Sequence, residues 1–208
     1  MLAGEYAVLR PSGTALAVAV AQVVETNLRP GPGQITMHAF DQTFSLSPGQ
    51  QAAPGLLGFA ARALAWLQNH HAISLKHDVT LQVAGAVGGA KVGLGTSAAV
   101  TVAALRAALV SNGLNWTPAQ VADAARQTHG AGQGAGSGYD VTTIAYGGCI
   151  AYRRSPDRAE PLAWPRGLHG LALFSGAPAP TQAALDKPPI AQRHLNTINT
   201  ATRHLLTA

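Results

Sequence analysis

The chain has 208 residues, 47% apolar and 11% charged, which is enough to bury the core of one large domain. Its formal net charge of +5 favours an anionic partner, although a solvated basic surface explains the same charge. The basic residues form no dense run, which favours a phosphorylated metabolite over nucleic acid. A single cysteine, Cys149, excludes an internal disulfide and a cysteine-based zinc site. Without a membrane-length apolar run or a signal peptide, we expect a cytoplasmic protein with no membrane partner.

The first third of the chain is predicted to be mostly sheet. Residues 15–26 form an apolar, Val-rich run typical of one strand. Shorter strands are expected at 34–40 and 43–46, on either side of a turn at Asp41-Gln42. Apolar residues recur at helical spacing over 56–67, which predicts a helix that ends near His70 and His71. Residues 77–83 then alternate between apolar and polar, which predicts a strand.

Two Gly-rich segments divide the second half. A buried helix is expected at 98–110, and the capping box at 117–120 predicts a helix that ends near Thr128, before the second Gly-rich segment. The remaining elements expected are a short helix at 139–146, strands at 149–153 and 171–174, and a helix after Gln192. Because strands and helices alternate without a regular βαβα rhythm, the pattern predicts an α+β fold.

The first Gly-rich segment, Gly93-Leu94-Gly95-Thr96-Ser97-Ala98, comes where a strand meets the buried helix. Glycines let a backbone approach a phosphate, while the free amides and the dipole at a helix N-terminus favour its negative charge. The hydroxyls of Thr96 and Ser97 add hydrogen-bond donors or a magnesium ligand, and Lys91 adds a cation. An ordinary Gly turn in which Thr96 caps the helix explains the same residues.

The second segment ends in Gly136-Ser137-Gly138-Tyr139-Asp140. A carboxylate placed there can take a proton from an attacking hydroxyl, but an Asp in the first turn of a helix is also common. His129, just before this segment, is interpreted as a helix C-terminal cap. Near the N-terminus, residues 4–9 are interpreted as the start of a strand, with Glu5 at the end of the sheet.

Three stretches occur in a characteristic order: G-E-Y-A-V-L at 4–9, K-V-G-L-G-T-S-A-A-V-T-V-A at 91–103, and G-Q-G-A-G-S-G-Y-D-V at 132–141. Together they resemble the GHMP small-molecule kinases, most closely phosphomevalonate kinases. The resemblance implies an N-terminal domain over 1–165 with a ribosomal-protein-like left-handed βαβ unit, and the start of a largely absent C-terminal domain over 166–208.

The resemblance also implies ATP and Mg²⁺ as cofactors and a phosphorylated small-molecule acceptor from the mevalonate route to isoprenoids. Asp140 would be the catalytic base or the charge that aligns the acceptor, and Ser97 would contact the metal. The nucleotide would bind at Lys91, Gly93, Leu94, Gly95, Thr96, Ser97 and Ala98. The acceptor would lie near Glu5, Tyr6, Ser137 and Gly138.

Two features of the family are missing from the sequence: a Lys upstream of residue 4 and a third Gly-rich motif. We therefore expect the chain to bind Mg-ATP but to turn over weakly or not at all. Two alternatives stay open, namely a mevalonate kinase or other GHMP kinase, and a truncated, inactive nucleotide-binding protein. A polyanion-binding protein ranks below both.

Overall fold

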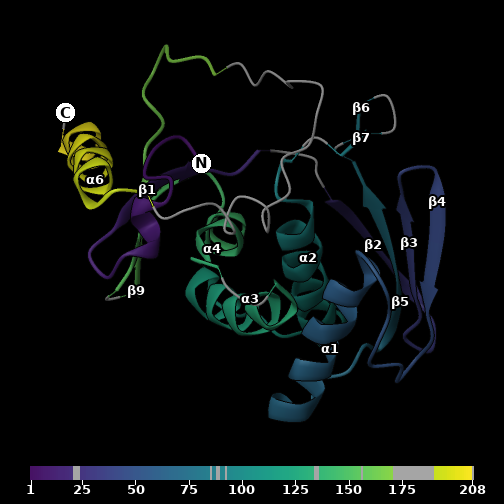
Figure 1. Cartoon of the computed structure of the whole chain (residues 1–208). Coiled ribbons are helices and arrows are strands. Elements are labelled where there is room, and N and C mark those ends of the chain that lie inside the picture. The colour runs from purple at the N-terminus through teal and green to yellow at the C-terminus, as the bar shows by residue number, and fades with distance from the viewer. Residues whose placement is uncertain are drawn as a thin grey trace.

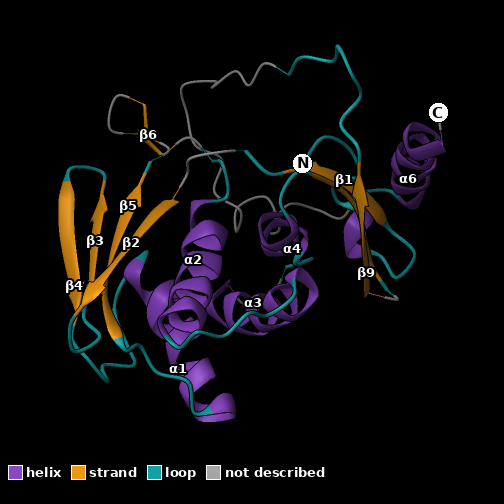
Figure 2. Ribbon diagram, turned by 180° about the vertical axis from the view of Figure 1, so that it is seen from behind, coloured by secondary structure: helices purple, strands orange, loops and turns teal. Residues whose placement is uncertain are grey.

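The computed structural model describes residues 1–20, 24–84, 86–87, 90–91, 93–133, 136–155, 157–170 and 190–207. In this part of the chain four helices lie between two β-sheets, as both views show (Figure 1 and Figure 2). The four helices are α1 (Leu57–His71), α2 (Thr96–Ser111), α3 (Pro118–Gln133) and α4 (Tyr139–Tyr146). A fifth, α6 (Gln192–Thr207), contacts the smaller sheet at β1.

The larger sheet has the strand order β2–β5–β3–β4. These strands are β2 (Val24–Pro30), β3 (Ile35–Ala39), β4 (Gln42–Leu46) and β5 (His77–Val83). β3 and β5 run parallel, and the connection between them contains β4 and α1, so the sheet includes a βαβ unit. Its other pairs are antiparallel, which confirms the mixed α+β fold. The left-handed crossover stays a prediction.

The smaller sheet has the order β1–β8–β9, and all its pairs are antiparallel. Its strands are β1 (Thr14–Val18), β8 (Cys149–Arg154) and β9 (Asp157–Leu162). The N-terminal residues add to its edge, because Ala3 forms a bridge with Leu16. A two-stranded hairpin, β6 (Ala86–Val87) with β7 (Ala90–Lys91), precedes the first Gly-rich segment.

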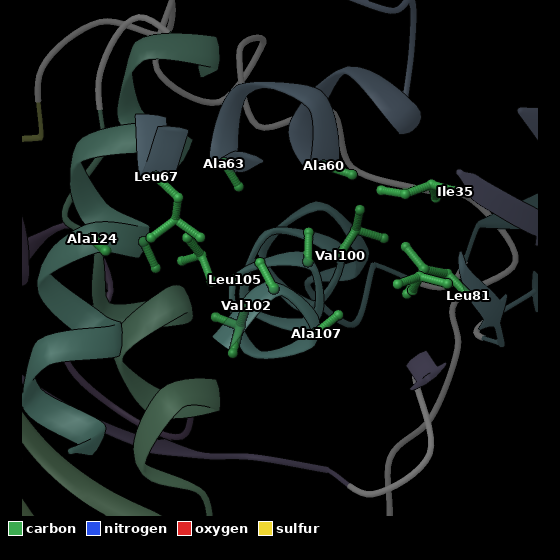
Figure 3. Close-up of a cluster of buried hydrophobic side chains, with 14 of the residues drawn as sticks. Ile35, Ala60, Ala63, Leu67, Leu81, Val100, Val102, Leu105, Ala107 and Ala124 are labelled. Atoms are coloured by element: carbon green, nitrogen blue, oxygen red, sulfur yellow. The ribbon is translucent and has the colours of Figure 1, made fainter. Parts of the chain in front are cut away.

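The main core is built around α2, which is apolar on nearly all sides, as expected for a helix enclosed by other elements. Figure 3 shows Val100 and Leu105 of α2 surrounded by side chains from the large sheet, α1 and α3. Alanines such as Ala60 and Ala63 on α1 are fully buried, and their small size lets the helices approach closely. The position of α2 is therefore fixed by packing on several sides.

Two expectations about the first third are wrong in detail. Residues 15–26 do not form one strand, because β1 joins the small sheet and β2 joins the large one, on opposite sides of the helices. The turn between β3 and β4 is centred on Phe40-Asp41, whose φ angles are 53° and 62°. Two positive φ angles in a two-residue hairpin loop are typical of a type I′ turn.

Residues 4–9 are not the start of a strand. They form a turn and a short 3-10 helix, η1 (Ala7–Leu9), preceded by Tyr6 with a φ of 58°. Gly4 has a φ of 94°, and a Cβ there would overlap the carbonyl oxygen of Thr14, so this segment lies directly against β1. Only glycine fits such a close approach without displacing the strand.

The second half follows the predicted order with two differences. α3 does not end near Thr128 but continues through Gly130 to Gln133, since glycine ends a helix only where it leaves the helical conformation. β9 was not predicted, because its mostly exposed sequence with Pro161 is typical of an edge strand without apolar alternation. The strand expected at 171–174 lies outside the described residues. No helix of the described part is long and apolar enough to cross a membrane.

Candidate functional site

A cavity of about 750 Å³ opens between α2, α4 and the strands β1 and β2. Gly93, Leu94 and Gly95 line it, and so do Tyr139 and Asp140 from the first turn of α4. The fold therefore brings together the two Gly-rich segments, which lie more than 40 residues apart in the sequence. Most of the remaining lining is apolar, which suits a site that positions a ligand with few polar groups.

The first Gly-rich segment leaves open space at its glycines. Gly93 and Gly95 both have a φ of 75°, and a Cβ built on either would meet no atom within 4 Å. Gly95 is the residue before α2 and has the left-handed conformation that L side chains rarely adopt. The backbone at the N-terminus of α2 can thus be approached closely by a ligand.

Thr96 supports a polar ligand at this point. Its side chain is fully buried, and its Oγ1 has no hydrogen-bond partner in the described part of the chain. A buried hydroxyl without a partner is unfavourable, so such an atom calls for a ligand, an ion or water. A hydroxyl oxygen can coordinate Mg²⁺, and the O–H group can donate a hydrogen bond to a phosphate, so Thr96 fits a magnesium–phosphate group.

Ser97 lies beside α3. It is 8% exposed, and its Oγ is 3.1 Å from Nε2 of His129, which is 4% exposed. The interpretation of His129 as a C-terminal cap is wrong, because the residue lies inside α3 and its ring is buried. The spacing of Val121, Ala125 and His129 at i, i+4 and i+8 places His129 on the buried face, and this signal was available in the sequence.

The turn before Asp140 is held by two side chains from other elements. The hydroxyl of Tyr152 donates to the carbonyl oxygen of Ser137 at 2.7 Å. Arg126 lies under Gly138, where a Cβ would meet its Cγ and Cδ at 2.8 Å. Burial, followed by the charge of Asp157, raises the pKa of Tyr152 to about 12, so its hydroxyl keeps the donated proton at neutral pH.

Asp140 is half-buried and faces the cavity. Its Oδ1 accepts a hydrogen bond from the amide of Val141 at 2.9 Å, while Oδ2 makes no hydrogen bond to any described residue. Burial raises the pKa of the neighbouring Tyr139 to about 12, and the charges of Asp140 and Glu5 add to this effect. Tyr139 is therefore a neutral hydrogen-bond donor at the same wall of the cavity.

The other predicted residues have varied positions. Glu5 and Tyr6 are exposed and do not line the cavity, although the charge of Glu5 acts on Tyr139. Among the described lining residues, Thr96, Ser97, Ala98, Ser137 and Gly138 are likewise absent. Lys91 pairs with Ala86 through its backbone, and its side chain lies outside the described residues. The described residues contain no group of three His, Cys, Asp or Glu that could hold a metal ion.

Sequence reasoning missed Arg106. Only three residues of α2 are not buried, Ala103, Arg106 and Val110, and all three line the cavity. Nη2 of Arg106 donates to the carbonyl oxygen of Ala145 at 2.7 Å, and no carboxylate among the described residues forms an ion pair with it. Arg106 is the only charged residue between Thr96 and Ser111, which was a usable signal.

Residues 58–148 match a family model described as the GHMP kinases N terminal domain. This segment is similar to the N-terminal domain of the GHMP kinases. It contains all of α2, α3 and α4, nearly all of α1 and both Gly-rich segments, so the Gly93–Gly95 wall and the Asp140 wall of the cavity both lie within the matched range. The comparison with curated proteins gives no significant match.

Several solved structures share the fold of this chain. The Lin0012 protein from Listeria innocua is 28% identical with a TM-score of 0.62, over 73% of this chain and 45% of that protein. A Streptococcus pneumoniae phosphomevalonate kinase, solved with phosphomevalonate and AMPPNP, is 20% identical with a TM-score of 0.62, over 73% and 46%. A D-glycero-D-manno-heptose 1-phosphate kinase from Bacteriodes thetaiotaomicron is 19% identical with a TM-score of 0.60, over 79% and 57%. The chain spans about half the length of these proteins.

Gly95→Ala tests the phosphate-loop assignment. The added methyl meets no protein atom within 4 Å, but it points into the open space at the start of α2. We expect a backbone cost of about 1–2 kcal/mol in stability and, because the methyl blocks close approach, an affinity for Mg-ATP lowered by roughly tenfold or more. Calorimetric titration and thermal melting measure the two effects.

Gly113→Ala is the matched control, since Gly113 has a φ of 67°, equally open surroundings and a position after the far end of α2. It should lose similar stability and keep its nucleotide affinity. Equal affinity losses at both positions would mean that only strain was measured, and unchanged affinity in Gly95→Ala would remove the loop from the nucleotide site.

Proposed function

We propose that this chain is the nucleotide- and acceptor-binding part of an ATP-dependent small-molecule kinase. The observation that carries the proposal is one cavity lined both by the Gly93–Gly95 backbone at the start of α2 and by Asp140 at the start of α4. Phosphoryl transfer needs a phosphate held in place and a group that orients the attacking oxygen, and little other chemistry. The two walls of this cavity would supply both requirements.

The triphosphate would bind at the N-terminus of α2. The amides of its first turn, the open backbone at Gly95 and the hydroxyl of Thr96 would hold the β- and γ-phosphates. Ser97 and Thr96 would hold a magnesium ion, which would neutralise phosphate charge during the transfer. The helix dipole of α2 adds a favourable field for the same anion.

Asp140 would act on the acceptor. Its Oδ2 is available to take the proton of an attacking hydroxyl, or to align an attacking phosphate oxygen against the γ-phosphorus. The new bond forms between that oxygen and phosphorus, and ADP leaves with the electrons of the bond that breaks. Tyr139, from the same turn, would donate a hydrogen bond to the acceptor, because its proton is retained at neutral pH.

The acceptor would carry an anionic group. Arg106 is exposed to an otherwise mostly apolar cavity. Its Cα lies about 15 Å along α2 from the start of the helix, and side chains on a helix tilt toward the N-terminus, so its side chain tilts back toward Gly93–Gly95. This supports a phosphorylated acceptor. With the motif at 132–141, it makes phosphorylation of phosphomevalonate to diphosphomevalonate our specific proposal, within the mevalonate pathway.

Coupled ADP release against phosphomevalonate, mevalonate and galactose tests this function, with enzyme in excess so that slow transfer is detected. We expect transfer to phosphomevalonate to be fastest. Transfer only to mevalonate would identify a mevalonate kinase. Mg-ATP binding without transfer to any acceptor would favour an inactive nucleotide-binding protein.

Asp140→Asn tests the role of the carboxylate. It keeps the size and polarity of the side chain but removes its charge, so Mg-ATP affinity should stay within about twofold while transfer slows by about a hundredfold or more. Single-turnover assays measure the rate of transfer, and titration measures the Mg-ATP affinity. Asp41→Asn, in the exposed β3–β4 turn, is the control and should behave like the wild type. Normal transfer by Asp140→Asn would mean that Asp140 only stabilises the N-terminus of α4 and does not act on the acceptor.

Arg106→Gln tests the anionic acceptor. Removing the guanidinium charge should raise the KM for a phosphorylated acceptor by about tenfold and leave Mg-ATP affinity unchanged, because the triphosphate would bind at Gly93–Gly95, which ten residues separate from Arg106. Arg29→Gln, on the exposed side of β2, is the charge-matched control. An unchanged KM would mean that Arg106 only caps the end of α4, through its hydrogen bond to the carbonyl oxygen of Ala145.

A further inference from the structure

The hydroxyl of Ser97 and the imidazole of His129 form a buried pair that joins α2 to α3. Their polar atoms are 3.1 Å apart, and both residues are more than nine-tenths buried. The backbone of Ser97 is held as well, because Thr101 Oγ1 donates to its carbonyl oxygen at 2.9 Å. Ser97 is therefore fixed at both its main chain and its side chain.

The imidazole is itself held by an aromatic neighbour. The ring centroid of Phe59, on α1, is 5.1 Å from that of His129, with an angle of 35° between the ring planes. The guanidinium of Arg62 lies 4.5 Å from the centroid of the same Phe59 ring. Three helices thus fix the imidazole plane, and with it the direction from which Ser97 is contacted.

We propose that His129 is the positioning residue for Ser97: its Nε2 accepts the hydroxyl proton of Ser97 and leaves the lone pairs of Oγ directed at the divalent cation of Mg-ATP. This inference rests on the proposed function. It assigns to His129 no contact with the substrate, and it distinguishes Ser97 from Thr96, whose Oγ1 has no partner among the described residues.

The physical reason is that a serine hydroxyl rotates freely unless a partner selects one orientation. A hydroxyl whose proton points toward a metal cannot coordinate it, so a fixed acceptor on the opposite side improves the ligand. Partners of this kind orient metal ligands in many proteins, and their loss typically lowers metal affinity by about 10- to 100-fold. A purely structural histidine would lower stability without a selective effect on the metal.

The test is the affinity of the whole chain for ATP, measured by calorimetric titration with Mg²⁺ and again with EDTA. His129→Leu fills the buried volume but accepts no hydrogen bond, so affinity with Mg²⁺ should fall by about tenfold while affinity in EDTA changes by less than about twofold. His129→Gln offers an amide near the position of Nε2 and should restore most of the magnesium-dependent affinity.

Two further variants complete the design. Thr128→Val is the matched control, because Thr128 is buried on the same helix and its hydroxyl donates to Ala124 of α3 itself. Its magnesium-dependent affinity should equal that of the wild type. In the double variant Ser97→Ala with His129→Leu, the loss should be no larger than for Ser97→Ala alone, as expected for two residues that act through one interaction.

The outcomes separate the inference from the function on which it rests. A wild-type chain that binds no ATP overturns the proposed function, and the inference with it. The inference alone is overturned if the wild type binds ATP but His129→Leu loses affinity equally in Mg²⁺ and in EDTA, or loses none. If His129→Leu does not fold, two other variants test the inference. Ser97→Ala must lose the magnesium-dependent affinity and His129→Gln must keep it. A Ser97→Ala variant that keeps this affinity, or a His129→Gln variant that loses it, overturns the inference.

Discussion

The burial of α2 is the constraint on which the rest of the structure depends. Thirteen of its 16 residues are buried, so the helix cannot shift without disturbing the large sheet, α1 and α3 together. Its small residues allow this enclosure, and its first turn is presented at a fixed place. A helix N-terminus favours anions wherever it lies, but here the surrounding core also determines what can approach it.

The cavity follows from the same constraint. The three residues of α2 that are not buried face the cavity, among them Arg106. The start of α4 adds a group of the opposite charge, Asp140, which follows a turn held by Tyr152 and Arg126. Arg126 also pairs with Asp157 at the start of β9, so the small sheet helps to fix that turn. The rigid supports come from core and sheet, while Gly95 and Asp140, which line the cavity, lie at the starts of α2 and α4, as is usual for sites that must be positioned by their scaffold.

Elements with a strong local pattern could be predicted from sequence. α1, β5 and α4 were predicted correctly because apolar spacing and length agree there with the tertiary environment. The division of 15–26 between two sheets could not be predicted, since strand propensity does not report which sheet a residue joins. The two Gly-rich segments were recognisable, whereas the Ser97–His129 pair depends on how α2 and α3 pack. The continuation of α3 through Gly130 was missed because a glycine in the sequence is only a weak signal for the end of a helix.

Amide hydrogen exchange with and without Mg-ATP tests the central claim most directly, because it reports on the backbone that is assigned to the phosphates. We predict that Mg-ATP slows exchange in the peptides covering 93–99, with a smaller effect over 137–141. Exchange at 112–117, after the far end of α2, should not change. Protection confined to other segments, or nucleotide binding without any change at 93–99, would contradict the assignment of this helix N-terminus as the nucleotide site.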